Sequence, residues 1–521
     1  MAFKKPENDI IALVIVLLIG AMYYYVSLNS SLIFGDETFY ALEAKAIHDT
    51  SFMPKFDAFV STDIWHVQFI RPPIYIFIIT FAFSLLGDLG IKLIVPLFTI
   101  LSGILTYLFM KKVGWPEGGL AATLILMMLP GIVTYGVMNY VETLLMLLSI
   151  MTLYFGYICF ETKSKKYAVL TGIAAMFMLL TDTTGVFIMA VLFFYSILMV
   201  IKNKSYKEYG KLFGIIAVVA LILVSPFFIR EAIIWGSACY LPFIDIGACY
   251  GIADNPVIQQ PTGLSFDASV APEGTGLPIL KFGLLNYITF ALSIPLLLTV
   301  CLGISGVFSA KSNFTNMLLL WLGMFLIVTF AVSTSSRSED AVRFTMFGFP
   351  SLAIISGMFM SSIYKKFDKN KLTTLVIIFL IIASSFYFGY YKFGAMLSIK
   401  QNSFQGLVAA CVWVDKNTAN DSLFYSIYSR QTAWLCDRHA KSTVPDKEAI
   451  ALTNNDTSYQ HLKLHGYDYV LIEAFTISNQ KYEEGNTIDF VNYLQGSSKF
   501  ERVFDNTNTY GQNGILIYKV L

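Results

Sequence analysis

Two adjacent carboxylates, Asp36 and Glu37, follow directly after the first long apolar segment, in the run GDETFY at residues 35–40. Ionisable side chains at the depth or the edge of a membrane are costly to desolvate, so such residues are candidates for function. A carboxylate placed there could act as a general base toward a hydroxyl or an amine. The structural alternative is that acidic residues in the first turn of a helix complement the helix dipole.

Basic residues that could bind an anionic group stand near the ends of other apolar segments. A phosphate at the membrane surface needs Arg or Lys, and Arg offers a bidentate fork of donors. The candidates for this role are Arg71, Lys92, Arg230 and Arg343. These residues stand near span ends on one side of the membrane, which we call the outer rim. Further candidates on this rim are Tyr40, His66, Glu142, Glu339 and Asp340.

Several of these residues also have a structural interpretation. Lys92 could extend along the membrane toward lipid phosphates. His66 follows a tryptophan and fits an interfacial polar aromatic residue. Asp182 stands between threonines and fits a helix cap better than a catalytic role. Arg343 closely follows Glu339 and Asp340, and its pairing with them could be purely structural.

Membrane helices are the elements that must position these residues. The chain of 521 residues is 56% hydrophobic and 14% charged, whereas soluble domains carry about a quarter charged residues. Eleven apolar runs are each near the length that crosses a membrane as a helix. They cover residues 10–28, 91–110, 118–135, 141–160, 167–181, 184–201, 212–229, 283–309, 315–333, 344–363 and 371–391. The shorter run 72–86 opens with two prolines and fits a re-entrant or interfacial helix.

Lysine positions give the orientation. If the run 72–86 does not cross, the lysines near residues 4–5, 111–112, 163–166, 202–211, 311 and 365–371 all fall on one side. Positive residues in short loops mark the cytoplasm. The N-terminus is therefore predicted to be cytoplasmic, with residues 30–90, 230–282, 334–343 and everything after about 392 outside. The loop 230–282, rich in proline and glycine, is predicted to be a mobile lid.

Two domains are expected from this topology. Residues 1–392 form the transmembrane domain. Residues 393–521 mix β-type runs at 423–428, 469–473 and 514–520 with a helical stretch at 404–415, which predicts an extracytoplasmic α/β domain. Cys411 and Cys436 in this tail, and Cys239 and Cys249 in the lid, are local pairs that an oxidising compartment would allow to bond, although spacing does not prove connectivity.

Some functions are disfavoured. A net charge of +1 gives no basis for nucleic-acid binding by bulk electrostatics. The chain has no glycine-rich phosphate loop, HExxH or CxxC motif, which disfavours an ATP-driven pump or a zinc peptidase.

Three short motifs, in order and on the predicted outer side, resemble those of the class C glycosyltransferases, membrane enzymes that use polyprenyl-phosphate sugars. The motifs are Asp36-Glu37-x-x-Tyr40, Arg71-Pro72-Pro73-Ile74-Tyr75, and Glu339-Asp340-x-x-Arg343-Phe344 leading to Pro350. The chain is most similar to protein O-mannosyltransferases and to the aminoarabinose transferases that modify lipid A. The resemblance covers the membrane half and implies a polytopic α-helical fold of this class with a C-terminal extracytoplasmic α/β domain.

Roles follow from the resemblance by position. It implies that Asp36 is the general base and that Glu37 orients the acceptor or its neighbours. It implies that Arg71 holds the donor phosphate, with Arg230 and Arg343 as helpers. Lys92 stands where the family often has Arg.

Departures from the family pattern limit what is carried over. Ile70 precedes Arg71 where the aminoarabinose transferases use a carboxylate in a metal site. We therefore assign no metal ligand, and a requirement for a divalent cation is left open. Asp182 stands where relatives commonly carry lysine. The tail has no WWDxG-like signature, which argues against a catalytic oligosaccharyltransferase subunit.

The sequence thus predicts an enzyme that moves a sugar from a polyprenyl-phosphate donor to a protein, glycan or lipid acceptor on the extracytoplasmic face, in contact with membrane lipids. The alternative is a secondary transporter of a lipid-linked or anionic solute, which predicts inverted repeats that the sequence does not show. A non-catalytic receptor or assembly subunit would explain the tail but not Asp36 and Glu37 together with the Arg-Pro-Pro motif.

Overall fold

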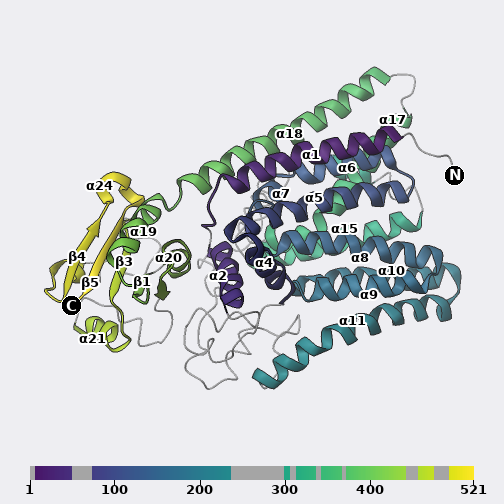
Figure 1. Cartoon of the computed structure of the whole chain (residues 1–521). Helices are drawn as coiled ribbons and strands as arrows, with labels where there is room; N and C mark the ends of the chain where they lie inside the picture. The colour runs from purple at the N-terminus through teal and green to yellow at the C-terminus, as the bar shows by residue number, and fades with distance from the viewer. Residues whose placement is uncertain are drawn as a thin grey trace, which may run out of the picture.

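A bundle of long helices and a small α/β domain at one end of it make up the molecule (Figure 1). The computed structural model describes residues 6–33, 35–49, 73–235, 299–304, 312–335, 342–366, 371–426, 428–441, 456–474 and 492–521. Helix α1 (Pro6–Leu28) begins at the end of the bundle away from the α/β domain (Figure 1).

Seven helices in the described part of the chain are long and apolar enough to cross a membrane. They coincide with seven of the eleven predicted runs. Six are α1 (Pro6–Leu28), α5 (Asp88–Lys112), α8 (Glu142–Thr162), α11 (Tyr206–Trp235), α15 (Asn313–Ser335) and α17 (Phe349–Lys366), the last preceded by η5 (Met346–Gly348). The seventh joins η2 (Thr183–Gly185) to α10 (Val186–Asn203).

The other predicted runs differ in detail. Residues 118–135 form two helices, α6 (Pro116–Met128) and α7 (Pro130–Tyr135), because Pro130 cannot donate the backbone hydrogen bond that would continue α6. Residues 167–181 form α9 (Lys165–Leu179), and 371–391 belong to α18 (Lys371–Asn402), which has 32 residues. The run 283–309 lies largely outside the described residues.

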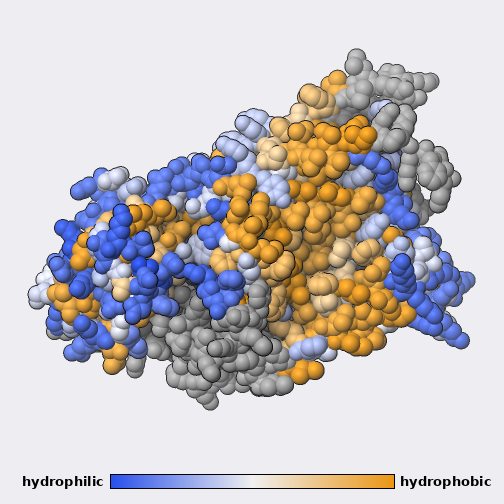
Figure 2. Space-filling view, viewed as in Figure 1, coloured by the Kyte–Doolittle hydropathy of each residue, from blue (hydrophilic) through white to orange (hydrophobic). Residues whose placement is uncertain are grey.

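The sides of the bundle are apolar. Hydrophobic residues cover the helices, while hydrophilic residues cover the α/β domain and the opposite end of the bundle (Figure 2). Large side chains such as Leu18, Leu221 and Phe379 are 65–67% exposed on these sides. Exposed apolar surface on this scale marks contact with a membrane or another protein, and here it covers helices that are long and apolar enough to cross a membrane. The protein is therefore a multi-pass membrane protein, as the sequence predicted.

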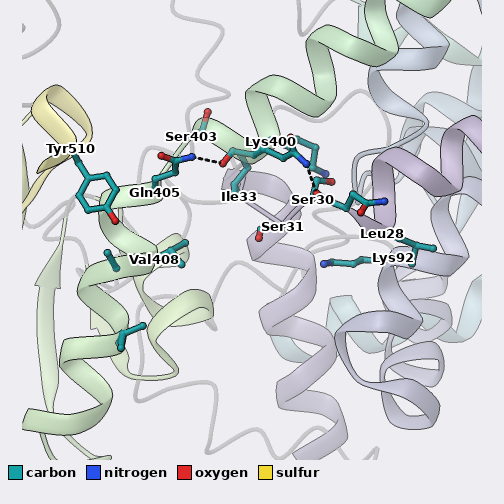
Figure 3. Close-up of a pocket in the computed structure, with 14 residues that line it drawn as sticks. Leu28, Ser30, Ser31, Ile33, Lys92, Lys400, Ser403, Gln405, Val408 and Tyr510 are labelled. Carbon is teal, nitrogen blue, oxygen red and sulfur yellow. Dashed lines mark hydrogen bonds between the residues drawn. The ribbon is translucent and has the colours of Figure 1, made fainter.

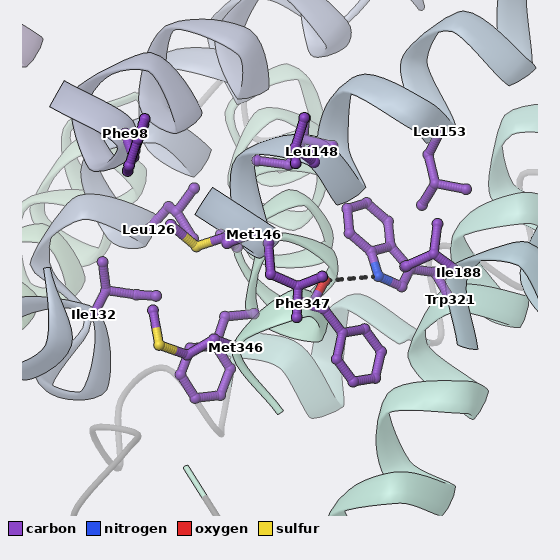
Figure 4. Packing of buried hydrophobic residues seen from close by; sticks show 14 of the residues in the cluster. Phe98, Leu126, Ile132, Met146, Leu148, Leu153, Ile188, Trp321, Met346 and Phe347 are labelled. Atoms are coloured by element: carbon purple, nitrogen blue, oxygen red, sulfur yellow. Dashed lines mark hydrogen bonds between the residues drawn. The ribbon is translucent and has the colours of Figure 1, made fainter. Parts of the chain in front are cut away.

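Close helix packing holds the bundle together. Trp321 is fully buried and its indole Nε1 donates a hydrogen bond of 3.0 Å to the carbonyl oxygen of Phe347 (Figure 4). Helices α6 and α17 meet through Gly118 and Gly357, where a Cβ atom on Gly357 would lie 2.2 Å from the carbonyl oxygen of Gly118. Small residues permit such close backbone approach in membrane helices.

Two short helices lie at the end of the bundle that faces the α/β domain (Figure 1). Helix α2 (Gly35–Asp49) runs across the bundle helices, and α4 (Pro73–Leu86) packs against it. Helix α4 has 14 residues, so at about 1.5 Å per residue it is too short to cross a hydrocarbon core of about 30 Å. This agrees with the predicted re-entrant or interfacial segment.

The C-terminal domain is built on a five-stranded sheet. The strand order is β2-β1-β3-β5-β4, with β1 parallel to β2 and β3, and β5 antiparallel to β3 and β4. The strands are β1 (Leu423–Ser426), β2 (His439–Lys441), β3 (Tyr469–Glu473), β4 (Phe500–Asp505) and β5 (Ile515–Val520). The three predicted β-type runs correspond to β1, β3 and β5, so the predicted α/β domain is confirmed.

Helices surround this sheet. They are α19 (Gln405–Asn417), α20 (Ser429–Cys436), α21 (Asp456–Leu464) and α24 (Thr507–Tyr510), with η8 (Gly511–Asn513). A disulfide between Cys411 and Cys436 joins α19 to the end of α20. Cys239 and Cys249 lie outside the described residues. The domain boundary predicted at residue 392 falls inside α18, which continues to Asn402.

Candidate active site at the end of the bundle

Asp36, in the first turn of α2, lies between two arginines of other elements. Its Oδ2 atom is 2.8 Å from Nη2 of Arg343, which precedes η5. Its Oδ1 atom is 3.5 Å from Nη1 of Arg430, in the first turn of α20. One guanidinium therefore comes from the membrane bundle and the other from the C-terminal domain.

Arg343 is shared between two carboxylates. Its Nε atom donates a hydrogen bond of 3.0 Å to Oε1 of Glu142, at the start of α8, and its Cζ atom lies 4.2 Å from the centre of the Tyr140 ring. The side chain of Arg343 is 13% exposed and that of Glu142 is 3% exposed. The sequence predicted that these two residues belong to one rim, and the structure brings them into contact.

Glu37 has a different environment from its neighbour Asp36. It is fully buried, and its Oε1 atom lies 2.7 Å from Nζ of Lys400 and 3.0 Å from the backbone nitrogen of Asn139. Its Oε2 atom accepts a 3.2 Å hydrogen bond from the backbone nitrogen of Ile33. A buried ion pair of this kind is tolerated because hydrogen bonds satisfy the remaining polar atoms.

The same cluster extends into the bundle through Asn139. The Asn139 side chain donates to the backbone oxygen of Glu37 and accepts from the hydroxyl of Tyr75 in α4, at 3.0 and 2.7 Å. Tyr40 is also buried, and its ring packs edge-on against Tyr75 at 5.0 Å. These contacts fix the first turn of α2, and with it the position of Asp36.

Lys92 lies at a separate cavity of about 590 Å³. The cavity is lined by the end of α1, by Lys92 of α5 and by the junction between α18 and α19, and Lys92 extends toward Ser31 (Figure 3). The other lining residues named in the figure are Leu28, Ser30, Ile33, Lys400, Ser403, Gln405, Val408 and Tyr510. Since the ammonium group of Lys400 binds Glu37, this cavity adjoins the buried ion pair.

The remaining predicted residues divide into two groups. Arg71, His66, Glu339 and Asp340 lie outside the described residues, and of Arg230 the structure describes only the backbone, within α11. Asp182 is described, and its Oδ1 atom accepts a 2.8 Å hydrogen bond from the backbone nitrogen of Thr184. Its predicted role as a helix cap is confirmed.

Three residues of the site were missed at the sequence level: Arg430, Lys400 and Asn139. Arg430 could have been found, because it follows the carboxyl end of β1, where side chains of α/β sheets commonly reach ligands. Lys400 and Asn139 carry no comparable signal, since each stands alone beside an apolar run. In the part of the chain that the structure describes, no three His, Cys, Asp or Glu residues are grouped to hold a metal ion.

Comparison with known proteins places this arrangement in a known fold. Residues 70–229 match the family model of dolichyl-phosphate-mannose-protein mannosyltransferase. No curated protein sequence matches the chain. The structure is similar to ArnT from Cupriavidus metallidurans bound to undecaprenyl phosphate, at 12% identity and a TM-score of 0.63, over 99% of this chain and 98% of that one.

Two further structures share the fold. The oligosaccharyltransferase AglB from Archaeoglobus fulgidus, in complex with an inhibitory peptide and a dolichol-phosphate, has a TM-score of 0.61 at 13% identity, over 89% of this chain and 69% of that one. The arabinofuranosyltransferase AftD from Mycobacteria has a TM-score of 0.57 at 12% identity, over 97% and 40%. The predicted class C glycosyltransferase fold and the resemblance to that class are confirmed.

Proposed function

We propose that this protein transfers a sugar from a polyprenyl-phosphate donor to an acceptor hydroxyl or amine, with Asp36 as the general base. The observation that carries the proposal is the placement of Asp36, partly exposed at the end of the membrane bundle and flanked by two guanidinium groups. The match to the mannosyltransferase family model supports it, as do the lipid phosphates in the similar ArnT and AglB structures.

The reaction would be a direct displacement. The acceptor oxygen or nitrogen attacks the anomeric carbon while Asp36 takes its proton, and the bond from that carbon to the phosphate oxygen breaks. The electron pair leaves with the phosphate, and cations stabilise the charge that develops there. Arg343 is suited to fix Asp36, because Glu142 and the Tyr140 ring hold its guanidinium on two further sides.

The geometry favours an anchoring role for Glu37. Its carboxylate is fully buried and already receives hydrogen bonds from Lys400, Asn139 and Ile33. A group enclosed in this way is suited to holding the first turn of α2 and poorly suited to contacting an acceptor. We therefore propose that Glu37 acts on the reaction through the position of Asp36.

The other residues predicted for the rim include the remaining phosphate ligands. Arg71 and Arg230 keep the roles that the family resemblance implies. Lys92 lines the cavity beside the Glu37–Lys400 pair, so we do not include it among the groups around Asp36. Glu339 and Asp340 precede Arg343 in sequence and stay candidates for the rim.

We also propose that the α/β domain is extracytoplasmic and that the N-terminus is cytoplasmic. Several lysines support this orientation. Lys111 binds Asp9 near the N-terminus of α1, Lys163 binds Glu208, and Lys202 binds Asn313. These three lysines stand at the bundle end where α1 begins, away from the α/β domain (Figure 1), as expected for cytoplasmic loops.

Asp36→Asn tests the proposed function most directly. Purified wild type and variant would be supplied with a panel of polyprenyl-phosphate hexoses and pentoses and with peptide, glycan and lipid acceptors. General-base catalysis typically contributes about 10²–10⁴-fold to the rate. We therefore expect a rate loss of that size for every donor and acceptor combination that the wild type uses. Asp421→Asn, an exposed acidic residue of the C-terminal domain, is the matched control. Full transfer by the Asp36 variant would overturn the assignment of the base.

A further inference from the structure

We propose that Arg430 of the C-terminal domain is a ligand of the donor phosphate, and that it exchanges Asp36 for this phosphate when the donor binds. This inference rests on the proposed function and adds a catalytic residue from the soluble domain to a site otherwise built by the membrane bundle. Three observations carry it: the two unequal contacts of Asp36, the interface that positions α20, and the charge balance of the cluster.

The contacts of Asp36 differ in strength. Arg343 reaches Oδ2 at 2.8 Å, a hydrogen-bond distance, whereas Arg430 stands 3.5 Å from Oδ1, beyond the usual range for N–H···O bonds. The side chain of Arg430 is 38% exposed and that of Arg343 is 13% exposed. Arg430 is thus the more exposed of the two guanidinium groups, and its contact with Asp36 is the longer one.

A built interface delivers this guanidinium. Its Cζ atom lies 4.8 Å from the centre of the buried Phe39 ring in α2, within reach of a cation–π interaction. Four residues further along α20, Trp434 packs against Leu32, Ala41 and Ile91 of the membrane bundle. Residues spaced by four lie on one face of a helix, so Arg430 and Trp434 present the same face of α20 to the bundle.

Two links at the end of α20 fix its orientation. Asp437, just beyond the helix, forms an ion pair with Lys45 of α2. Cys436 is bonded to Cys411, which ties α20 back to α19. Arg430 therefore has a backbone held at the site, with a side chain that retains solvent access. That combination suits a residue that changes partners.

Charge balance gives the exchange a chemical reason. Asp36 and Glu142 contribute two negative charges, and Arg343 and Arg430 contribute two positive ones, so these four described residues together carry no net charge. A donor phosphodiester adds one negative charge, and the phosphate that leaves carries more. A guanidinium that stayed on Asp36 would also stabilise its carboxylate and weaken it as a base.

Movement of the Arg430 guanidinium from Asp36 to the phosphate would compensate the added negative charge and would also make Asp36 a stronger base. Oδ1 of Asp36 becomes available for the acceptor proton, the new bond forms from the acceptor atom to the anomeric carbon, and the carbon–phosphate-oxygen bond breaks. Its electron pair stays on the phosphate oxygen, which Arg430 stabilises. Because Glu142 also holds Arg343, that residue remains to orient Asp36.

Direct binding of a short-chain polyprenyl phosphate, the donor without its sugar, tests the exchange. Wild type, Arg430→Ala, Arg430→Lys and the control Arg502→Ala would be titrated in detergent, with the uncharged polyprenol as a second probe. Arg502 is an exposed arginine of the same domain. Because the variant loses a charged hydrogen-bond donor to the phosphate, we expect phosphate affinity to fall about 10–100-fold in Arg430→Ala. Arg430→Lys should recover part of the loss, and polyprenol affinity should not change.

The outcomes separate the two proposals. If wild type binds the phosphate and Arg430→Ala binds it equally well, the role of Arg430 is wrong while the proposed function stands. The same conclusion follows if phosphate and polyprenol affinities fall together, because the loss would then not depend on charge. If wild type binds no polyprenyl phosphate, the proposed function itself fails. An unchanged thermal unfolding midpoint verifies that each variant is folded.

Discussion

Asp36 and Glu37 are neighbours in one helical turn, yet they belong to two different regions of the molecule. Asp36 stands at the open rim, 22% exposed in its side chain and between arginines of two domains. Glu37 points into a closed cluster in which its side chain and that of Lys400 are 0% and 1% exposed. The comparison shows that two neighbouring carboxylates of the same charge differ sharply in exposure, which fits the proposed roles of Asp36 as a base and of Glu37 as an anchor.

The largest effect that would sharpen this comparison is expected at Lys400. Removing one partner of a buried ion pair typically costs about 3–5 kcal/mol, because the other charge is left buried and uncompensated. We expect Lys400→Met to lower the thermal unfolding midpoint strongly, measured by tryptophan fluorescence in detergent, with the exposed Lys416→Met as a control. Asp36→Asn should leave the midpoint nearly unchanged. Equal unfolding midpoints for Lys400→Met and wild type would contradict the proposed anchoring role of Glu37.

Glu473, a buried carboxyl that forms no ion pair among the described residues, provides the next test. Burial at the end of β3 raises the pKa of Glu473 to about 7 from a usual 4.5. Between about pH 4.5 and pH 7 the folded state therefore keeps the Glu473 proton that the unfolded state has lost. Protonation of Glu473 contributes fully to stability below about pH 4.5, and this contribution disappears as the pH rises to about 7.

The corresponding variant is Glu473→Gln, which cannot ionise. At 1.36 kcal/mol per pKa unit, the effect is about 3 kcal/mol at most. We expect the variant to gain stability relative to wild type between pH 5 and pH 8, measured as the difference in unfolding midpoint. Glu501→Gln, at an exposed position of β4, should show no such trend. Parallel pH curves for wild type and Glu473→Gln would contradict the prediction.

The smallest effect is expected at Glu142, which connects the rim to the bundle. Loss of its charge in Glu142→Gln strengthens the attraction of Arg343 to Asp36, which makes Asp36 a weaker base. We expect kcat to fall about tenfold, or about 1.4 kcal/mol, with KM unchanged. The unfolding midpoint should fall less than in Lys400→Met, because Asp36 still compensates the charge of Arg343. Glu142→Asp should restore part of kcat. A rise in KM instead would indicate that Glu142 acts in substrate binding.

Parts of this molecule follow from local sequence, and others do not. Apolar length located the membrane helices, and the Pro-Pro start of the run 72–86 correctly indicated a short helix. The site candidates Asp36, Glu142 and Arg343 were recognisable because charge at a span end is conspicuous. The contact between Arg430 and Asp36 could not be predicted, since it depends on how α20 docks on α2. Nor does any local pattern distinguish a buried lysine such as Lys400 from one that solvent surrounds.

The spread of the site along the chain has a consequence for biosynthesis. Asp36 emerges from the ribosome long before Lys400 and Arg430, which follow it far along the chain. Lys45 and Asp437, which join α2 to the C-terminal domain, are 392 residues apart. A nascent or prematurely terminated chain therefore carries the carboxylates before it has their late cationic partners. The complete cluster assembles only when the C-terminal domain has folded back onto α2.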